Sequence, residues 1–323
     1  MQQHKHKISY VTKENQLENL LDIYLSECLF VRGLSPRTIK GYREVFKTFQ
    51  KIVPEVSAIE HLNPNIIIQF FTKLGTRKRF EGKHLKVGVK ASTVRTYYNK
   101  LMAFFNWLEV NGYLEFGYIS KKIKRPPEPK YTDKRALSNS DVSKIITAIV
   151  TNTTNDEFLR VRDLTIVYSL LYLGVRRSEL LGLRVQDIDF IKRNVLVNYE
   201  TSKSTENRYI PLHTTLEDHL RELLRLRKER VITTSYLINS SKEDKVLSVH
   251  GLKHWVEKYK RLSGVRFHLH RFRHTFTCEL AKKGADMRTI MKLLGHTSSK
   301  MTEAYLRSLS SEKAQQFIDE LGF

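Results

Sequence analysis

The stretch His270-Arg-Phe-Arg-His274 lies in the second half of the chain, and Leu294-Gly-His296 and Tyr305 follow it. Two earlier segments are Gly174-Val-Arg-Arg-Ser-Glu179 and Thr201-Ser-Lys203. Together the five segments supply arginines and a lysine that can clamp phosphate oxygens, histidines that can exchange protons, and a tyrosine that can carry a phosphoryl group. No segment decides the function alone, but together they indicate an enzyme that acts on a phosphate ester.

The whole chain is strongly basic, with 56 Lys and Arg against 34 Asp and Glu, a net charge of +22 over 323 residues. Residues 1–130 carry 23 basic and 11 acidic residues (+12), and residues 131–323 carry 33 and 23 (+10). A field of this sign favours a polyanionic partner, and double-stranded DNA is the leading candidate. Charge alone leaves open the alternative that the protein is basic but does not bind DNA.

Cysteine usage and hydropathy indicate the compartment. Cys28 and Cys278 lie far apart without the spacing of metal ligands, so we expect a reducing environment. No apolar stretch is long enough to span a bilayer, and residues 1–7 lack the apolar segment of a signal peptide. A cytoplasmic, nucleoid-associated bacterial protein with no membrane partner is expected.

The first part of the chain predicts a compact domain of four helices, at residues 16–31, from Ser35-Pro36 onward, at 64–74 and at 92–110. On the second helix, serine suits the cap, proline suits the first turn, and apolar residues recur every three or four positions. Basic side chains occupy the outer faces. The candidates for DNA contact are Arg37, Lys40, Arg43, Lys47, Arg77, Arg79, Lys86 and Arg95.

Residues 76–90 are dense in charge and contain Gly82 and Gly88. We expect this segment to grip a DNA backbone, because phosphate contacts supply most non-specific affinity; a solvated loop is the alternative. Residues 119–135 include the run Pro126-Pro-Glu-Pro129, which prevents a helix and indicates an extended linker.

The predicted domains are therefore residues 1–118, a linker at 119–135, and residues 136–323. In the last of these, helices are predicted at 138–150, 162–173, 215–231, 248–262, 270–283, 286–294 and 311–321. Strands are predicted at Ile188–Ile191, Val195–Tyr199 and Arg208–Leu212, and their short connections suggest an antiparallel meander. The predicted fold class is mainly α with a small antiparallel sheet, a four-helix domain followed by an α+β domain.

Cleaving a phosphodiester without a metal requires groups that stabilise negative charge on the non-bridging oxygens, and guanidinium groups match that geometry. Arg176 follows Gly174 and precedes a short helix whose amides can add to its pull on a phosphate. Arg273 lies three residues after His270, on the same face of a predicted helix. Considered singly, each arginine has a better structural explanation: an ion pair with Glu179 for Arg176, and surface exposure for Arg273.

Lys203 lies in the predicted hairpin turn at residues 201–207. A lysine in a turn is usually just solvated, but neighbouring arginines would lower its pKa towards the range of a general acid. Tyr305 is one of 15 tyrosines, and a tyrosine with an ordinary pKa needs cationic surroundings or a base to attack at neutral pH. His296, nine residues earlier, can bind phosphate or orient the attack.

The histidines leave a zinc site as an alternative that the sequence disfavours. His270 and His274 are four residues apart on one predicted helix, as are His250 and His254 on another. The arginines between the first two would repel a dication, and neither pair has an acidic third ligand nearby. We therefore expect no metal and no cofactor.

In these residues the chain resembles the tyrosine recombinase, or phage integrase, family, whose signature is Arg, Lys, His-x-x-Arg, His and Tyr in that order. The matching residues are Arg176, Lys203, His270, Arg273, His296 and Tyr305. Flanking features also agree, among them Ser178-Glu179-Leu180, Pro211-Leu212 and Ser35-Pro-Arg-Thr-Ile39, so the resemblance covers nearly the whole chain and suggests an Xer-like or mobile-element integrase. Phe272, where leucine is usual, and Leu173, where threonine is frequent, depart from the pattern without removing a reacting group.

The resemblance implies which groups react. Tyr305 would attack the scissile phosphate, forming a 3′-phosphotyrosine link and freeing a 5′-hydroxyl. Lys203 would protonate the leaving 5′ oxygen, while His270 would exchange the tyrosine proton.

The resemblance also implies which groups hold the phosphate. Arg176 and Arg273 would stabilise the pentacoordinate charge with help from His296, and Glu179 would support the arginines. The phosphoester is exchanged and not hydrolysed, so neither a metal nor ATP is implied.

A SAM-like core-binding domain and a DNA breaking-rejoining catalytic domain are implied as well, clamped around duplex DNA at specific core sites. The implied assembly is a monomer or dimer when free and a homo-tetramer on synapsed DNA. An accessory directionality protein is a further possible partner. An apolar stripe of Ala314, Phe317, Ile318 and Leu321 can dock on a neighbour or pack on its own domain. Two rivals are left open: a relaxing enzyme of the type IB topoisomerase kind and a catalytically silent DNA-binding regulator.

Overall fold

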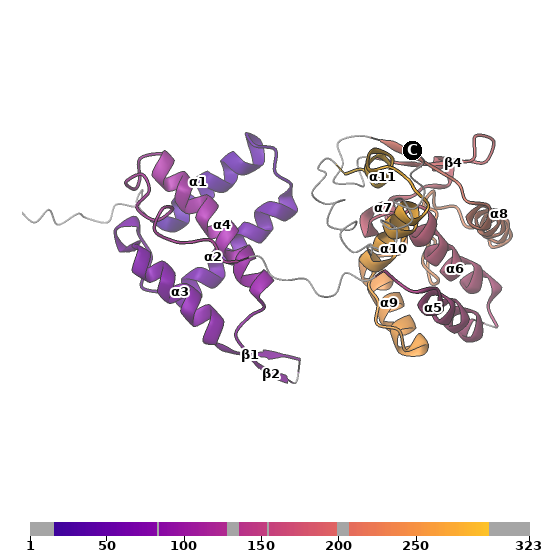
Figure 1. The fold of residues 1–323 in the computed structure, drawn as a ribbon, viewed down its shortest axis with the longest axis horizontal. Helices are drawn as coiled ribbons and strands as arrows, with labels where there is room; N and C mark the ends of the chain where they lie inside the picture. Colours follow the sequence, from indigo (N-terminus) through magenta and orange to yellow (C-terminus); the bar gives the residue numbers. More distant parts are fainter. Residues whose placement is uncertain (1–15, 83, 128–135, 154, 199–206, 297–323) are drawn as a thin grey trace, which may run out of the picture. The chain divides into compact units, whose positions relative to one another are not determined.

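A computed structural model describes residues 16–82, 84–127, 136–153, 155–198 and 207–296. The chain divides into two compact units, Met1–Tyr131 and Thr132–Phe323, and the division falls within the predicted linker (Figure 1). The exact bounds of the domains stay predictions. Among the described helices, none combines the length and the apolar character that a bilayer crossing requires.

Four α-helices build the described part of the first unit: α1 (Leu17–Phe30), α2 (Pro36–Ile52), α3 (Pro64–Thr76) and α4 (Ala91–Val110), coloured indigo to magenta in Figure 1. Ser35 caps α2 by accepting a hydrogen bond from an amide of the first turn, and Asn63 caps α3 in the same way. The helices bury large rings between them, and the centroids of neighbouring phenylalanine rings lie 5.1 to 6.0 Å apart. The predicted helical domain is confirmed.

The first unit stays packed beyond residue 118, where the sequence places the start of the linker. The carboxylate of Glu109, buried at the end of α4, accepts hydrogen bonds from the amides of Gly117, Ile119 and Ser120 at 2.8 to 3.0 Å. Burial raises the pKa of Glu109, but a hydrogen bond from the Ser120 hydroxyl and those from the three amides outweigh burial and lower the pKa. Ile119 and Ile123 enter the apolar core. The lysines and the arginine at residues 121–125 lie close to these isoleucines in the sequence, so the sequence showed no apolar periodicity that would have predicted their burial.

Residues 76–90, expected to be a DNA grip or a solvated loop, contain a β-hairpin. Strand β1 (Lys78–Glu81) pairs antiparallel with β2 (His84–Val87). Gly88, with a φ of +66°, follows β2 and packs against the end of α3. A Cβ at this position would lie 2.1 Å from the carbonyl oxygen of Gly75. The sequence did not predict the hairpin, because β1 has three charged residues and only one apolar residue, which hides the alternation in that strand.

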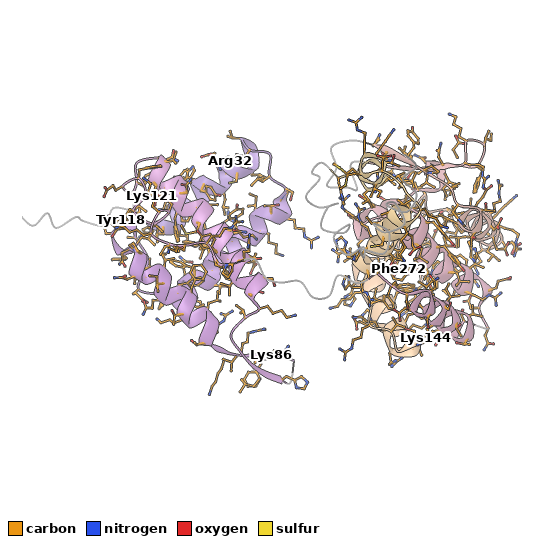
Figure 2. All side chains as sticks on the ribbon, viewed as in Figure 1. Arg32, Lys86, Tyr118, Lys121, Lys144 and Phe272 are labelled. Carbon is orange, nitrogen blue, oxygen red and sulfur yellow. The ribbon has the colours of Figure 1, made fainter. Side chains whose placement is uncertain are left out.

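The second unit packs its helices around α6 (Glu157–Tyr172), which is buried on most sides. Helix α6 contacts α5 (Asn139–Asn152), α8 (Thr214–Glu229) and α10 (Leu269–Lys282), and the described part also includes α7 (Arg177–Gly182), α9 (Val249–Ser263) and α11 (Met287–Leu294). Phe272 of α10 lies in the core of this unit (Figure 2).

Helix α6 begins at Glu157 and not at residue 162 as predicted. Asp156 caps it, and Phe158 in its first turn is buried. Arg162 and Asp163, the first two residues of the predicted helix, form a buried ion pair with N···O 2.7 Å apart. A charge that is neutralised by its neighbour can enter a core, and periodicity does not reveal this.

The sheet of the second unit is an antiparallel meander in the order β3 (Ile188–Asp189), β4 (Asn194–Val197) and β5 (Arg208–Pro211), as predicted. Its first strand is shorter than predicted. The carboxylate of Asp189 accepts hydrogen bonds from the backbone amides of Ile191 and Lys192, and this turns the chain. The last residue of the predicted second strand, Tyr199, and the predicted helix at 311–321 lie outside the described residues.

Candidate active site

The turn between α6 and α7 presents Arg176. Gly174 turns the chain with a φ of +56°, and a Cβ there would lie 2.3 Å from Cδ1 of the Phe276 ring. Glycine is therefore the residue that fits this turn without strain. Arg176 then occupies the N-cap of α7, and both its backbone amide and its guanidinium reach Glu179.

Glu179 is fully buried at the centre of the candidate site. Its Oε1 accepts hydrogen bonds from Nη1 of Arg176 at 2.8 Å and from Nη1 of Arg208 at 3.2 Å. Its Oε2 accepts from the amide of Arg176 at 2.7 Å and from Nη2 of Arg208 at 2.7 Å, and Nη1 of Arg273 lies 3.8 Å away. One carboxylate thus faces three guanidinium groups, which leaves a surplus of positive charge.

Arg208, at the start of β5, is the member of this cluster that sequence reasoning missed. Its side chain is buried, and besides Glu179 it donates from Nε to the carbonyl oxygen of Leu293 at 2.8 Å. The one available signal was its place directly after the predicted turn at residues 201–207. An arginine on a short strand is usually exposed, and spacing along the chain does not show that a buried carboxylate lies opposite.

Helix α10 brings Arg273 to the same place. Its side chain is 1% exposed, and it donates to the carbonyl oxygens of Gly174 at 2.7 Å and Leu294 at 2.5 Å. The alternative that placed Arg273 on the surface is wrong. The ion pair of Arg176 with Glu179 does exist, but the Arg176 side chain keeps 17% of its surface exposed, so the pair leaves it accessible.

The end of α11 is held by the three arginines. Gly295 ends the helix in the left-handed region with a φ of +61°, so its last carbonyl groups have no helical partners. The carbonyl of Leu293 binds Arg208, that of Leu294 binds Arg273 and Arg176, and that of Gly295 lies 3.4 Å from Nη2 of Arg176. Guanidinium groups at a helix C-terminus also complement its dipole.

His296 follows this turn and is buried beside Arg273. Nη2 of Arg273 lies 3.0 Å from Nε2 of His296, and a guanidinium only donates, so Nε2 is the acceptor and the ring proton is on Nδ1. Burial, followed by the charges of Arg273, Arg176 and Arg208, lowers the pKa of His296 to about 4. The imidazole is therefore neutral at pH 7.

His270 lies one turn before Arg273 on α10, on the same helical face. Partial desolvation of the imidazole lowers its pKa first, and the positive charges of Arg273, His268 and Arg176 lower it further. A histidine of this kind is an uncharged proton acceptor at neutral pH.

The structure thus brings Arg176, Glu179, Arg273 and His296 together, with His270 close enough to share their electrostatic field. Lys203 and Tyr305, the expected acid and nucleophile, lie outside the described residues.

No group of three or more His, Cys, Asp or Glu side chains is arranged to hold a metal ion within the described ranges. Nε2 of His250 and Nε2 of His254 lie 3.0 Å apart, and Nδ1 of His274 contacts Sγ of Cys278 at 3.3 Å.

The candidates for DNA contact fall into three groups. On α2, Arg37, Lys40 and Lys47 are exposed, while Arg43 is 2.6 Å from the carboxylate of Asp22. On the hairpin, Lys86 is exposed (Figure 2). Arg77 and Arg79 are half-buried. On α4, half-buried Arg95 reaches the carbonyl of Pro126.

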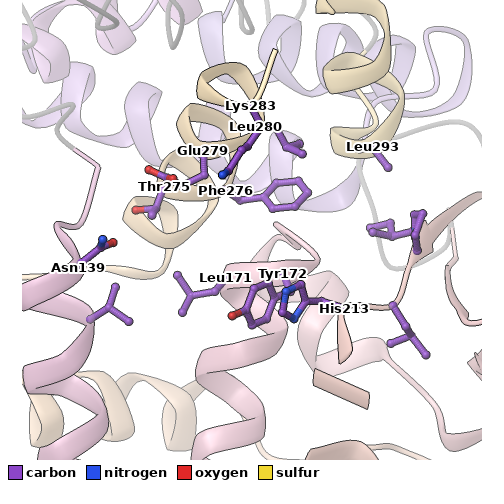
Figure 3. Close-up of a pocket in the computed structure, with 14 residues that line it drawn as sticks. Asn139, Leu171, Tyr172, His213, Thr275, Phe276, Glu279, Leu280, Lys283 and Leu293 are labelled. Atoms are coloured by element: carbon purple, nitrogen blue, oxygen red, sulfur yellow. The ribbon is translucent and has the colours of Figure 1, made fainter. Parts of the chain in front are cut away.

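A mostly apolar cavity of about 590 Å³ opens in the second unit (Figure 3). It lies beside the arginine cluster, because Leu293, whose carbonyl binds Arg208, lines it. It is lined by residues of α5, α6, β5, α10 and α11, including Leu171, Phe276, Leu280 and Leu293. The rings of Tyr172 and His213 stack on one side of it, with their centroids 3.9 Å apart.

Comparisons with known proteins identify the family of the chain. Residues 135–312 match the model of the phage integrase family. The chain is 28% identical over 297 residues to tyrosine recombinase XerC of Thermodesulfovibrio yellowstonii, covering 87% of this chain and 89% of the relative. It is also 28% identical over 320 residues to a tyrosine recombinase of Agathobacter rectalis, covering 95% and 97%.

Two solved structures share the fold. One is the XerH site-specific recombinase bound to a palindromic difH substrate, with a TM-score of 0.69 and 18% identity over 93% of this chain and 84% of that one. The other is the Tn1549 transposon integrase in complex with a circular intermediate DNA, with a TM-score of 0.70 and 16% identity over 94% and 99%.

Proposed function

The chain belongs to the phage integrase family, and we propose on that premise how its residues divide the work of a tyrosine recombinase. The reaction is site-specific recombination of DNA through a covalent phosphotyrosine intermediate. In the proposed division, Tyr305 is the nucleophile that forms the 3′-phosphotyrosine link, and Lys203 protonates the leaving 5′ oxygen. The order of the motif residues in the chain supports both roles.

The observation that carries the proposal is the convergence of Arg176 and Arg273 on one buried carboxylate beside His296. A phosphate at this cluster would meet guanidinium groups that Glu179 and backbone carbonyls already hold in place. Donors fixed in advance stabilise developing negative charge without reorganising. The surplus of positive charge around Glu179 would favour the bound phosphate.

The two histidines take different roles in this proposal. His296 is neutral at pH 7, so it contributes a hydrogen bond and the orientation of Arg273 and not a charge. His270 has a lowered pKa, so its neutral form can accept the proton of the attacking tyrosine.

A nicked suicide substrate tests the proposal. The target is first identified by sequencing the genomic fragments that the protein retains. A nick beside the scissile phosphate then lets the short cleaved strand diffuse away and traps the adduct. Wild-type protein and Tyr209→Phe, a change at an exposed strand residue, should form the adduct, and Tyr305→Phe should not. No adduct with wild type, or an adduct with Tyr305→Phe, would refute the assignment.

The same proteins separate recombination from its rivals. A relaxing enzyme would remove supercoils from a plasmid with no paired sites, whereas a recombinase exchanges strands between two sites. A silent regulator would bind DNA and form no adduct.

We further propose that the chain recognises specific core sites as a monomer or dimer and assembles as a homo-tetramer on synapsed DNA. The apolar cavity supports this, since it offers a seat for the apolar stripe of Ala314, Phe317, Ile318 and Leu321 from a neighbouring protomer. Such head-to-tail contacts close into a ring when the rotation between protomers allows it. Activity on DNA also supports a nucleoid-associated, cytoplasmic location.

A further inference from the structure

The β1–β2 hairpin has two chemically distinct faces. Residues directly opposite each other in an antiparallel pair share a face, and successive residues alternate. Lys78 pairs with Val87, and Phe80 pairs with Leu85, so these four residues lie on one face. Arg79 pairs with Lys86 on the other face.

The first face exposes large apolar side chains. Phe80 is 76% exposed, Leu85 54% and Val87 68%. A two-stranded hairpin is at best marginally stable in water, and no described residue covers this face. Contiguous exposed apolar surface of this kind marks a contact site.

The base of the hairpin is closed by hydrogen bonds and packs against the end of α3. The amide of Gly88 donates to the carbonyl of Arg77 at 2.8 Å, and Nε of Arg79 donates to the carbonyl of Gly88 at 2.8 Å. The close approach of Gly88 to the Gly75 carbonyl leaves no room for a side chain. The hairpin is therefore an arm with a defined base, projecting from the unit as Figure 1 shows.

The charge of the arm selects the partner. Residues 76–90 contain six Lys or Arg and one Glu, a net charge of 6 − 1 = +5. This complements a polyanion and disfavours a second copy of the same basic chain. The major groove of B-form DNA, about 12 Å wide, admits a two-stranded β-ribbon and exposes thymine methyl groups to apolar side chains.

We propose that the β1–β2 hairpin is a base-reading arm that enters the major groove of duplex DNA. Lys78, Lys86 and their basic neighbours contact phosphates along the groove walls, and Phe80, Leu85 and Val87 lie against thymine methyl groups. The proposal rests on the proposed function for its ligand, and adds a sequence preference that is separate from the catalytic cluster.

The test compares two phenylalanines of the same unit. Phe80→Ala should weaken binding of a core-site duplex about 10-fold, because it removes an apolar contact of one large side chain. Phe30→Ala, at the end of α1 and 81% exposed, is the matched control and should bind as wild type does. Neither ring is buried, so thermal melting of both variants should match the wild type.

A thymine-to-uracil exchange identifies the groove contact, because uracil lacks the methyl group of thymine. At footprint positions that depend on the hairpin, the exchange should weaken binding of wild type and of Phe30→Ala, and should weaken binding of Phe80→Ala less, because that variant keeps only Leu85 and Val87 on the apolar face. Lys86→Ala should lower the slope of log affinity against log salt by about 0.9, the value for one phosphate contact.

Equal affinities for Phe80→Ala and Phe30→Ala would overturn the proposal. So would a Phe80→Ala protein that binds one site normally and loses only cooperativity between two protomers, since the face would then contact protein. Adduct formation on the suicide substrate is scored in parallel at saturating protein. No adduct with wild type refutes the recombinase roles, whereas adduct formation with an unchanged affinity of Phe80→Ala refutes only the arm.

Discussion

The guanidinium of Arg208 grips both carboxylate oxygens of Glu179, at 2.7 Å from Nη2 to Oε2 and 3.2 Å from Nη1 to Oε1. This is the planar, two-point contact that arginine makes and lysine cannot. Since the same carboxylate also holds Arg176, the position of one proposed phosphate-binding arginine depends on a residue with no proposed contact to the phosphate.

Arg208→Lys should slow adduct formation about 10- to 100-fold, because the charge remains but the two-point contact is lost and Glu179 can move Arg176 away from the phosphate. DNA affinity should change little, because Arg208 is buried. Arg221→Lys, which alters an exposed pair with Glu217, is the control and should react as wild type does. Equal rates for the two variants would contradict a positioning role.

Removing Arg208 should also move the pH profile of the reaction. Its charge is one of three that lower the pKa of His296, so Arg208→Gln should raise that pKa. The rate should then begin to fall at a higher pH on the acid side than it does for wild type. A purely structural loss would lower the rate equally at every pH, so the profile distinguishes the two.

His296 should make folding stability depend on acid pH. Its pKa is about 4 in the folded protein and near 6.5 when unfolded, so the unfolded chain binds the proton more readily. The contribution of His296 to the free energy of unfolding is therefore highest above pH 6.5. It falls as the pH drops towards 4, by a total of about 3 kcal/mol. Urea unfolding at pH 7 and pH 4.5 should show a smaller loss for His296→Gln than for wild type. His254→Gln, on the exposed face of α9, should leave the loss unchanged.

Gly174→Ala should destabilise the second unit more than Gly284→Ala does. Both glycines have positive φ, but a Cβ at Gly174 would collide with the Phe276 ring while Gly284 has open space. We expect a loss of about 1 kcal/mol at Gly284 from backbone strain alone, and about 3 kcal/mol at Gly174. Thermal melting measures both. Similar losses at the two positions would mean that the ring yields without cost.

Lys203→Ala should cleave ordinary DNA slowly and recover when sulfur replaces the bridging 5′ oxygen. The thiolate leaves without protonation, so a missing general acid no longer limits the rate. Adduct formation on the two substrates measures the effect. If the sulfur substrate gives no recovery, another group is the acid.

Leu280→Lys should reduce assembly on paired sites about 10-fold while adduct formation at a single nicked site continues, because it places a charge in the cavity proposed for the neighbour's tail. Deleting residues 311–323 should have the same effect. Leu262→Lys, on α9 outside the cavity, is the control. If both cavity and tail variants instead lower the melting temperature of the monomer, the tail packs on its own domain.

Much of the fold could be predicted from periodicity and caps. The stripe Leu17, Leu20, Leu21, Tyr24 and Leu25 is buried as its spacing predicts, and Ser35 caps α2. The prediction failed where charged residues lie in buried or paired segments. Arg162 and Asp163 neutralise each other inside the second core, and the alternating strands at residues 78–87 are obscured by lysine and arginine.

The sequence by itself predicted the candidate site residues and their order, because Arg176, His270, Arg273 and His296 match the residue types and the order of the tyrosine recombinase signature. Only the tertiary structure decided that Arg208 joins them, that Glu179 is shared among three arginines, and that His296 is neutral. The reason is that burial and electrostatic energy depend on distances through space. Glu179 and Arg273 are 94 positions apart in sequence (273 − 179), yet their side chains lie 3.8 Å from each other.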